Sequence, residues 1–244
     1  QYQREGLFQN GLFANASLGK SETIKFENLG SKCYVLYKLN GFHFFEFNTA
    51  IIEKSPNLSQ VFANPRINNN LIPNLKSEKI NSVDINYYYR SSKLKSRITA
   101  YYAQIKNSNQ VSYYYTEGIN FNDLASDVIY NSNAFVNEIT TGINKKHLGI
   151  EISIEYKINP TWQTYFAANM GQYTYANNPN LILNVDNIAT TLDLGKVYLK
   201  NYKIPNTPQH AYSIGVEYKN PKYWWLGGNI NWLTHNYLAV SSLL

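Results

Sequence analysis

A short turn flanked by the same residue types occurs four times along this chain. The four copies are residues 37–41 (YKLNG), 89–93 (YRSSK), 156–160 (YKINP) and 218–221 (YKNP). Each copy follows a stretch in which apolar and polar residues alternate, and a second such stretch begins within a few residues. Two alternating stretches joined by a tight turn form a β-hairpin. The pattern therefore predicts four hairpins with all their short turns at one end.

The alternation with period two is clearest in residues 148–158. Ile150, Ile152 and Ile154 fall on one side of a strand, and Glu151 and Ser153 fall on the other. A helix would place Ile150 and Ile152 on different sides, so a strand is the better interpretation. The same reading predicts eight strands, near 24–39, 42–54, 77–91, 95–115, 134–158, 161–175, 208–219 and 223–235. Asn40-Gly41 is the strongest hairpin signal, because both residues tolerate a positive φ.

The links between the predicted hairpins are long and polar. They comprise residues 55–76, 116–133 and 176–207, and they are rich in Asn, Ser and Pro. Loops longer than about 15 residues usually carry function or lack a fixed structure. Short turns at one end of a set of hairpins and long loops at the other are typical of an outer-membrane β-barrel.

The composition fits a chain that crosses a membrane with strands. No apolar run approaches the roughly 18 residues of a transmembrane helix, but a transmembrane strand needs only about 9–11 residues, half of them apolar. Aromatic residues gather at the turn ends, where the membrane interface of a barrel lies. We expect interface aromatics at Tyr37, Phe42, Tyr89, Tyr156, Trp162, Tyr218 and Trp224. A soluble sandwich shares the alternation, but it would not need strands longer than 12 residues.

Several other classes of protein find little support. The net charge is +6, but several Lys and Arg residues gather at the turns and form no basic stripe interleaved with aromatics, so we expect no nucleic-acid partner. The four histidines match no metal-ligand spacing, and one cysteine forms no intramolecular disulfide. No local catalytic motif is present. We therefore predict a protein that is not an enzyme and has no metal or cofactor.

The polar faces of the predicted strands provide candidates for the lining of a lumen. A hydrated wall, or a surface that holds a plug through hydrogen bonds, is the main interpretation. The expected lumen-facing residues are Glu46, Asp84, Asn86, Arg97, Glu151, Glu155, Asn169, Glu217 and Asn229.

Tyrosines in and near the long links are candidates for ligand binding. Tyr113, Tyr114 and Tyr115 are consecutive, and Tyr198 and Tyr202 lie in the last long link. A tyrosine offers rigid area with a polar tip and can stack on a sugar or a peptide. A Tyr-rich extension of the strands above the membrane is an equally good interpretation.

Three stretches resemble a known family. Residues 61–107 (including KINSVDINYYYR), 135–162 (including HLGIEISIEYKINPTW) and 197–225 (including YKIPNTPQHAYSIGVEYKN) are similar to the C-terminal barrel region of TonB-dependent outer-membrane receptors. The similarity is to the Bacteroidota group, which often carries a carboxypeptidase-regulatory-like domain at the N-terminus. Together with residues 32–41 these stretches cover more than half of the chain, and they are patterns of a barrel wall rather than of a ligand site.

The resemblance implies an all-β fold: an antiparallel transmembrane β-barrel with short periplasmic turns and long extracellular loops. Our eight strands would be part of a larger barrel of 22 strands, filled by an N-terminal plug. The resemblance further implies import of a scarce ligand, such as a siderophore, glycan or peptide, across the outer membrane of a Gram-negative bacterium. The implied partners are outer-membrane lipid, the TonB energy-transducing complex through an N-terminal region, and a surface lipoprotein. No stretch resembles a plug or a TonB box, so we expect residues 1–244 to be the C-terminal portion of a receptor barrel.

Two alternatives remain at this point. The chain could be a complete eight-stranded outer-membrane barrel, porin-like or adhesin-like, in which the strand near 24–39 pairs with the strand near 223–235. It could instead be a soluble all-β carbohydrate-binding module, whose apolar faces would meet in a dry core.

Overall fold

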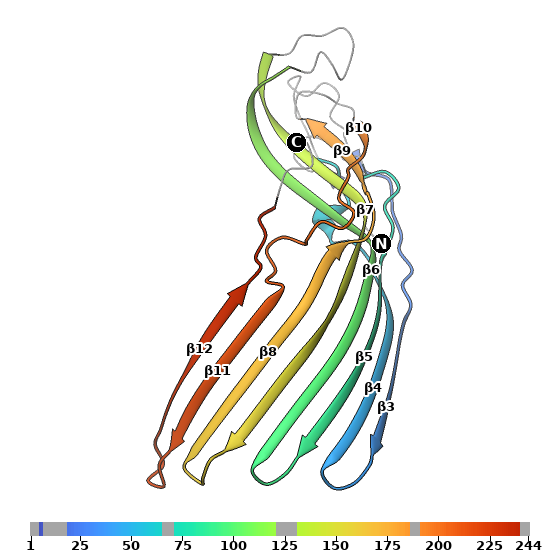
Figure 1. Ribbon diagram of the computed structural model, residues 1–244. Helices are drawn as coiled ribbons and strands as arrows, with labels where there is room; N and C mark the ends of the chain where they lie inside the picture. Colours follow the sequence, from blue (N-terminus) through green and yellow to red (C-terminus); the bar gives the residue numbers. More distant parts are fainter. Residues whose placement is uncertain (1–4, 7–18, 65–70, 121–130, 186–190, 240–244) are drawn as a thin grey trace.

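One curved antiparallel sheet forms most of the molecule (Figure 1). The computed structural model describes residues 5–6, 19–64, 71–120, 131–185 and 191–239. Eight strands follow one another across the sheet in the order β12-β11-β8-β7-β6-β5-β4-β3. Their bounds are β3 (Gly30–Lys38), β4 (His43–Lys54), β5 (Glu78–Arg90), β6 (Leu94–Asn120), β7 (Asn131–Lys157), β8 (Trp162–Tyr175), β11 (His210–Lys219) and β12 (Trp225–Thr234). All eight predicted strands and the four predicted hairpins are confirmed. A separate short pair joins β1 (Glu5–Gly6) to β2 (Gly19–Lys20).

Asparagine side chains close three of the four short turns. Oδ1 of Asn40 accepts hydrogen bonds from the backbone N–H groups of Phe42 and His43. Asn159 and Asn220 make equivalent bonds to the residues that follow them. Neither Asn40 nor Gly41 has a positive φ, so our reason for the first turn was wrong although the hairpin itself is present. The side-chain carbonyl fixes the bend without the left-handed conformation.

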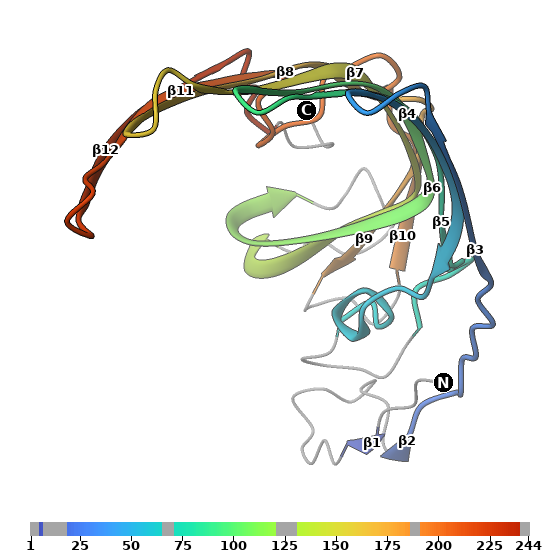
Figure 2. The ribbon, with the colours of Figure 1, turned by 90° about the horizontal axis from the view of Figure 1, so that it is seen from below.

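The sheet is open at both edges. β3 pairs only with β4, and β12 pairs only with β11, among the residues that the structure describes. Viewed from the short-turn end in Figure 2, these two strands lie at opposite ends of an arc. The closed eight-stranded barrel required the pairing of β3 with β12, so that alternative is wrong.

The outer face of the arc is apolar and uncovered. Large side chains project from it on every strand, and Ile85, Ile150 and Ile214 are about half exposed. These residues alternate with the polar residues of the other face, as the pattern predicted. A soluble module would bury such a surface in a second layer, and no second layer covers it in the described part of the chain. The alternative of a soluble carbohydrate-binding module, with its apolar faces in a dry core, is therefore wrong.

The hairpin of β6 and β7 continues far beyond its neighbours and bends over the inner side of the arc (Figures 1 and 2). Irregularities in the register occur near Ser108 and between Thr116 and Ile119. Asn107 and Gly142 have positive φ angles at the first of these bends. β-bulges of this kind increase twist and turn a hairpin away from the plane of its sheet.

Residues 176–207, which we predicted as a long polar link between hairpins, contain two further strands. β9 (Asn180–Val185) pairs with the extended part of β7, and β10 (Thr191–Lys196) pairs with β9. Leu181, Ile182 and Leu183 are buried. The extension of β7 provides an additional edge for pairing, which the sequence pattern did not reveal.

The buried core lies at the long-loop end. One cluster joins Val136, Leu183 and Val185, and another joins Ala63, Ile72, Ile139 and Ile182. The second cluster is next to a short 3₁₀ helix, η2 (Leu58–Gln60), which lies inside the arc (Figure 2). No helix among the described residues is long and apolar enough to span a membrane.

Candidate functional site

A row of polar side chains crosses the inner face of the sheet. Glu46, Asn86, Thr99, Glu151 and Asn169 are consecutive partners in the register from β4 to β8. Partners directly opposite each other project from the same face of a sheet. We call this face, on the concave side of the arc, the inner wall. By the same alternation, the other predicted lumen residues lie on the inner wall as well: Asp84, Arg97, Glu155, Glu217 and Asn229.

The packing at the upper part of the wall identifies the inner wall as the concave face. Tyr173 lies on the same face of β8 as Asn169 and belongs to a buried cluster with Ile204, against which Leu199 packs. The segment that contains these two residues runs between β10 and β11 on the inner side of the arc (Figure 2).

Two carboxylates at one end of the row are bridged by amides. Nδ2 of Asn48 donates to Oε1 of Glu46 over 2.7 Å and to Oδ1 of Asp84 over 2.8 Å. Nδ2 of Asn86 also donates to Asp84, and Oδ1 of Asn86 accepts from the Thr99 hydroxyl over 2.6 Å. Asn86 and Thr99 are buried. The amide donors therefore stabilise both carboxylates and hold their side chains in one arrangement.

Ion pairs follow along the next strands of the inner wall. Arg97 on β6 forms an ion pair with Glu151 on β7, and Lys95 on β6 forms one with Glu155 on β7. The nitrogen–oxygen distance is 3.0 Å in both pairs. Glu217 is paired with Lys219 on β11 over 2.7 Å. Asn229, by contrast, is exposed on β12 and lies opposite Gly215 in the register. The charged side chains named on β4, β5, β6, β7 and β11 of the inner wall are therefore held by ion pairs or by amide donors.

Tyrosine hydroxyls complete the wall near the bend. The hydroxyls of Tyr101 and Tyr173 lie 2.7 Å apart, and Asn169 bonds both of them. Two glycines that face each other in the register, Gly149 and Gly171, lie beneath these hydroxyls. Our sequence reasoning missed both tyrosines because we took only charged and amide residues as lining. Their positions in the alternation would have identified them.

Small residues form a hollow in the inner wall next to Arg97 and Glu151. Ser153, Ala167 and Ser213 are consecutive partners in the register. They line an open hollow of about 610 Å³. The combination of a shallow apolar floor and a fixed ion pair can hold a side chain or a solute that carries both polar and apolar groups.

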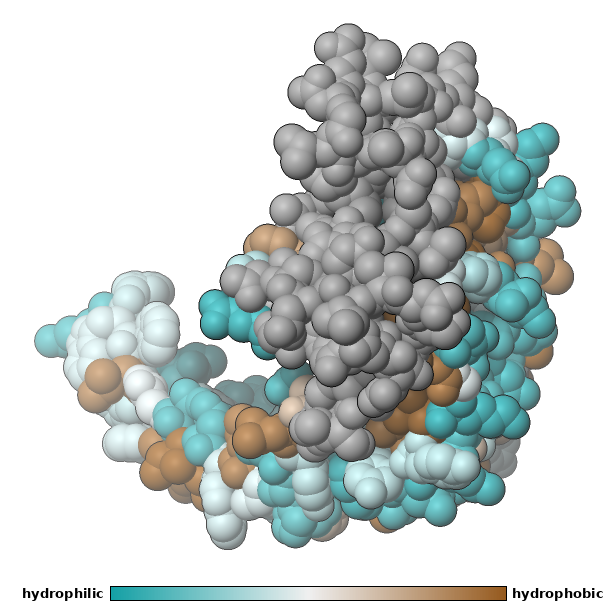
Figure 3. All heavy atoms as spheres, turned by 90° about the horizontal axis from the view of Figure 1, so that it is seen from above, coloured by the Kyte–Doolittle hydropathy of each residue, from teal (hydrophilic) through white to brown (hydrophobic). Residues whose placement is uncertain are grey.

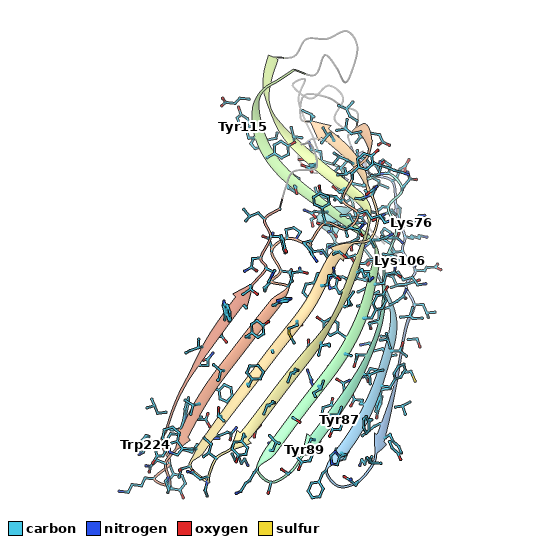
Figure 4. All side chains as sticks on the ribbon, in the orientation of Figure 1. Lys76, Tyr87, Tyr89, Lys106, Tyr115 and Trp224 are labelled. Carbon is cyan, nitrogen blue, oxygen red and sulfur yellow. The ribbon has the colours of Figure 1, made fainter. Side chains whose placement is uncertain are left out.

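The candidate ligand-binding tyrosines separate into two kinds. Tyr113 and Tyr115 on β6 are half exposed, and the ring of Tyr115 lies 5.1 Å from that of Phe135 (Figure 4). Tyr114 points to the opposite side and packs against Val136, Leu183 and Val185. Burial, together with the charge of Glu138, raises the pKa of the Tyr114 hydroxyl. Tyr114 is therefore a packing residue of the hairpin, which sequence reasoning did not separate from its neighbours.

Tyr198 and Tyr202 are strongly exposed in the segment that follows β10. No ring contact joins them to Tyr113 or Tyr115 in the part of the chain described. The two groups thus form separate aromatic surfaces at the long-loop end.

The predicted interface aromatics lie together at the short-turn end. The rings of Trp162 and Tyr218 are tilted against each other with centres 4.9 Å apart, and the ring centre of Tyr218 lies 5.3 Å from that of Trp224 (Figure 4). Phe42 and Tyr89 form another pair. Tyr37 and Tyr156 are exposed on the outer face. These rings form a band at the short-turn end of the sheet, and their place at a boundary between lipid and water stays a prediction.

No cluster of three or more His, Cys, Asp or Glu side chains that could hold a metal ion is found among the described residues. His210 and His235 approach each other, with ring centres 4.5 Å apart, at the upper end of the last hairpin.

The sequence matches a known family along most of its length. Residues 28–242 match the family described as "TonB dependent receptor-like, beta-barrel". The chain belongs to this family. The TonB-dependent receptor barrels are outer-membrane proteins, and the open sheet described above is a partial barrel of that type.

Comparison with one solved structure, the copper transporter OprC, gives the same fold, and a second structure is less similar. The copper transporter OprC has a TM-score of 0.54 at 15% identity, over 86% of this chain and 27% of the OprC chain. The toluene transporter TodX of P. putida has a TM-score of 0.48 at 11% identity, over 83% of this chain and 53% of the TodX chain. At these identities the likeness concerns the fold alone. The chain thus spans about a quarter of OprC and about half of TodX. Comparison with curated proteins finds no match.

Proposed function

We propose that this chain forms part of the barrel wall of a TonB-dependent receptor, which imports a scarce ligand such as a siderophore, a glycan or a peptide. The observation that supports this function is a single curved sheet with an uncovered apolar outer face and a hydrogen-bonded polar inner wall. In the outer membrane of a Gram-negative bacterium, lipid would cover the outer face, and water or a plug would contact the inner wall. The protein binds and transports its ligand rather than converting it.

The receptor that contains this wall is longer than residues 1–244. The two open sheet edges and the small share of OprC that the chain spans support this part of the proposal. The chain is the C-terminal portion of the barrel, and a preceding region supplies the plug and the contact with TonB. The resemblance to Bacteroidota receptors favours a carboxypeptidase-regulatory-like domain in that region, and a surface lipoprotein as partner at the long-loop end.

The ligand first meets the aromatic surfaces at the long-loop end. Tyr113, Tyr115, Tyr198 and Tyr202 are exposed there, and their rings can stack on a sugar ring or on a peptide side chain. The hollow beside Arg97 and Glu151 lies deeper along the inner wall. Its ion pair and its small residues suit a ligand with both polar and apolar groups.

Uptake by cells that produce the full-length receptor tests this function. Three isotopically labelled probes are supplied in turn: a ferric siderophore, a mixture of oligosaccharides and a mixture of short peptides. We expect one probe to accumulate inside cells only when both the receptor and TonB are present. A receptor with Tyr113→Ala and Tyr115→Ala should accumulate less of that probe, while Tyr37→Ala, at an exposed tyrosine on the outer face of the edge strand, serves as the control. Accumulation that is equal without TonB would contradict the proposal.

A further inference from the structure

Three lysines gather on the outer face of the sheet, at the end where the long loops lie. Lys79 on β5 and Lys106 on β6 are direct partners in the register. Lys146 on β7 lies opposite Gln104, two residues before Lys106 on the same face. Since alternate residues share a face, all three project from the side that carries Ile85, and not from the inner wall. We call Lys79, Lys106 and Lys146 the outer lysine cluster.

The outer lysine cluster carries more positive charge than its neighbours neutralise. Nζ of Lys79 lies 3.4 Å from Oε1 of Glu53, its partner on β4. In the part of the chain described, neither Lys106 nor Lys146 makes an ion pair. Like charges directly opposite each other across two strands repel and destabilise the sheet. An anion that bridged the ammonium groups would remove this repulsion.

The cluster lies at the border between an apolar and a polar zone. Val83, Tyr102 and Leu148 continue the same face toward the short-turn end. Nζ of Lys146 lies 6.0 Å from the ring centre of Tyr102, which is itself exposed. A lysine at such a border lays its aliphatic stem on apolar surface and extends its ammonium group into the polar zone.

Both kinds of residue are visible on the outer side of the sheet. Hydrophilic and hydrophobic side chains are mixed there in the view from the long-loop end (Figure 3). Lys106 projects from the outer side of the wall, and Lys76, just before β5, lies slightly above it (Figure 4).

We propose that the outer lysine cluster binds the phosphate groups of a phosphorylated glycolipid in the outer leaflet of the membrane. This inference rests on the proposed function, because the long loops must face the cell exterior. Three ammonium groups provide nine donors and the positive charge that phosphate oxygens require. The apolar face directly below offers a surface for the acyl chains, which a free phosphate would leave unused. Basic clusters beside an apolar span are a recurrent means of holding anionic headgroups.

Lipid binding by the full-length receptor, purified in mild detergent from outer membranes, tests the proposal. One variant carries K79Q, K106Q and K146Q. The matched control carries K38Q, K93Q and K222Q, which removes the same charge from exposed lysines at the short-turn end. The probes are a diphosphorylated lipid A and the same lipid after enzymatic removal of its phosphates, and native mass spectrometry measures the lipid bound per receptor.

We expect the cluster variant to bind the diphosphorylated lipid at least tenfold more weakly than the control variant does. The unmodified receptor should bind the dephosphorylated lipid as weakly as the cluster variant binds the intact one. Equal binding by the cluster variant and the control would overturn the proposal. Full competition by inorganic phosphate alone at millimolar concentration would overturn it too, because the site would then recognise free phosphate and not a lipid.

The outcome also separates this inference from the proposed function. A receptor that is absent from the outer-membrane fraction would reject both. A receptor that is found there and imports a probe in a TonB-dependent manner, but whose cluster variant binds lipid normally, would reject the lipid site alone. The migration of unheated and heated receptor on gels checks that both variants are folded.

Discussion

Arg97 donates from Nη2 to Oε2 of Glu151 over 3.0 Å, across β6 and β7 of the inner wall. The two side chains are 45% and 40% exposed, so water screens their attraction. We predict that a double-mutant cycle with Arg97→Gln and Glu151→Gln gives a coupling energy below about 1 kcal/mol. Urea unfolding of the full-length receptor in detergent measures it. A coupling of several kcal/mol would mean that another part of the receptor covers the pair and excludes water.

Successive residues of a strand lie on opposite faces of the sheet, so the same charged substitution should change the stability differently at each of them. Ile214 projects from the outer face of β11 and is 56% exposed, whereas Ser213 projects from the inner wall. Arginine on the lipid face near the middle of the membrane costs about 2–4 kcal/mol. We therefore predict that Ile214→Arg lowers the unfolding free energy by that amount in lipid vesicles.

Ser213→Arg is the matched control for this prediction. It adds the same side chain one residue away, on the polar face next to Ala167 and Asn231. Its effect should stay below about 1 kcal/mol, because arginine on a hydrated inner wall keeps its solvation. Equal losses for the two variants would show that the outer face does not contact lipid.

Close packing at Gly149 leaves no room for a side chain. A Cβ atom there would lie 2.5 Å from the Tyr101 hydroxyl and 2.7 Å from the backbone oxygen of Met170. Backbone atoms of a paired strand cannot move aside without breaking the register, so we predict that Gly149→Ala costs about 1–3 kcal/mol. Gly228→Ala on β12 is the control, since a Cβ there meets nothing within 4 Å. Thermal unfolding of the two variants should differ by several degrees, and equal midpoints would contradict the prediction.

The sequence alone predicted the strands of the wall because lipid and lumen impose opposite requirements on alternate residues. Ile150 lies on the apolar outer face and Glu151 on the polar inner wall. Exchanging the two residues would put a carboxylate on the apolar face. The positions of the hairpins followed from the same periodicity, whereas the conformation of the first turn did not, because the side chain of Asn40 closes it without a positive φ. The inner wall could be predicted as a set of polar residues. Its network could not, because the contact of Asn48 with Asp84 depends on the register between β4 and β5.

The long-loop end was predicted poorly for a physical reason. Residues 181–185 (LILNV) are buried on both faces, so they show no alternation. Their pairing partner is an extension of β7 that lies beyond a change of register near Gly142. The same bend determines which tyrosines of the 113–115 run are exposed. No periodic pattern in one sequence contains this information, because it depends on contacts between distant segments.

The opposite orientations of Tyr113 and Tyr114 give a test of this part of the fold. Tyr114 packs against Leu183 and Val185 of β9, while Tyr113 is half exposed. Removal of the partly buried Tyr114 ring costs its packing contacts with this cluster. We predict that Tyr114→Ala speeds amide hydrogen exchange in residues 180–185 about tenfold, which corresponds to about 1.4 kcal/mol of local stability. Tyr113→Ala should leave that exchange unchanged. Mass spectrometry of peptides from the exchanged full-length receptor measures both, and faster exchange in the Tyr113 variant alone would contradict the arrangement of β6 against β9.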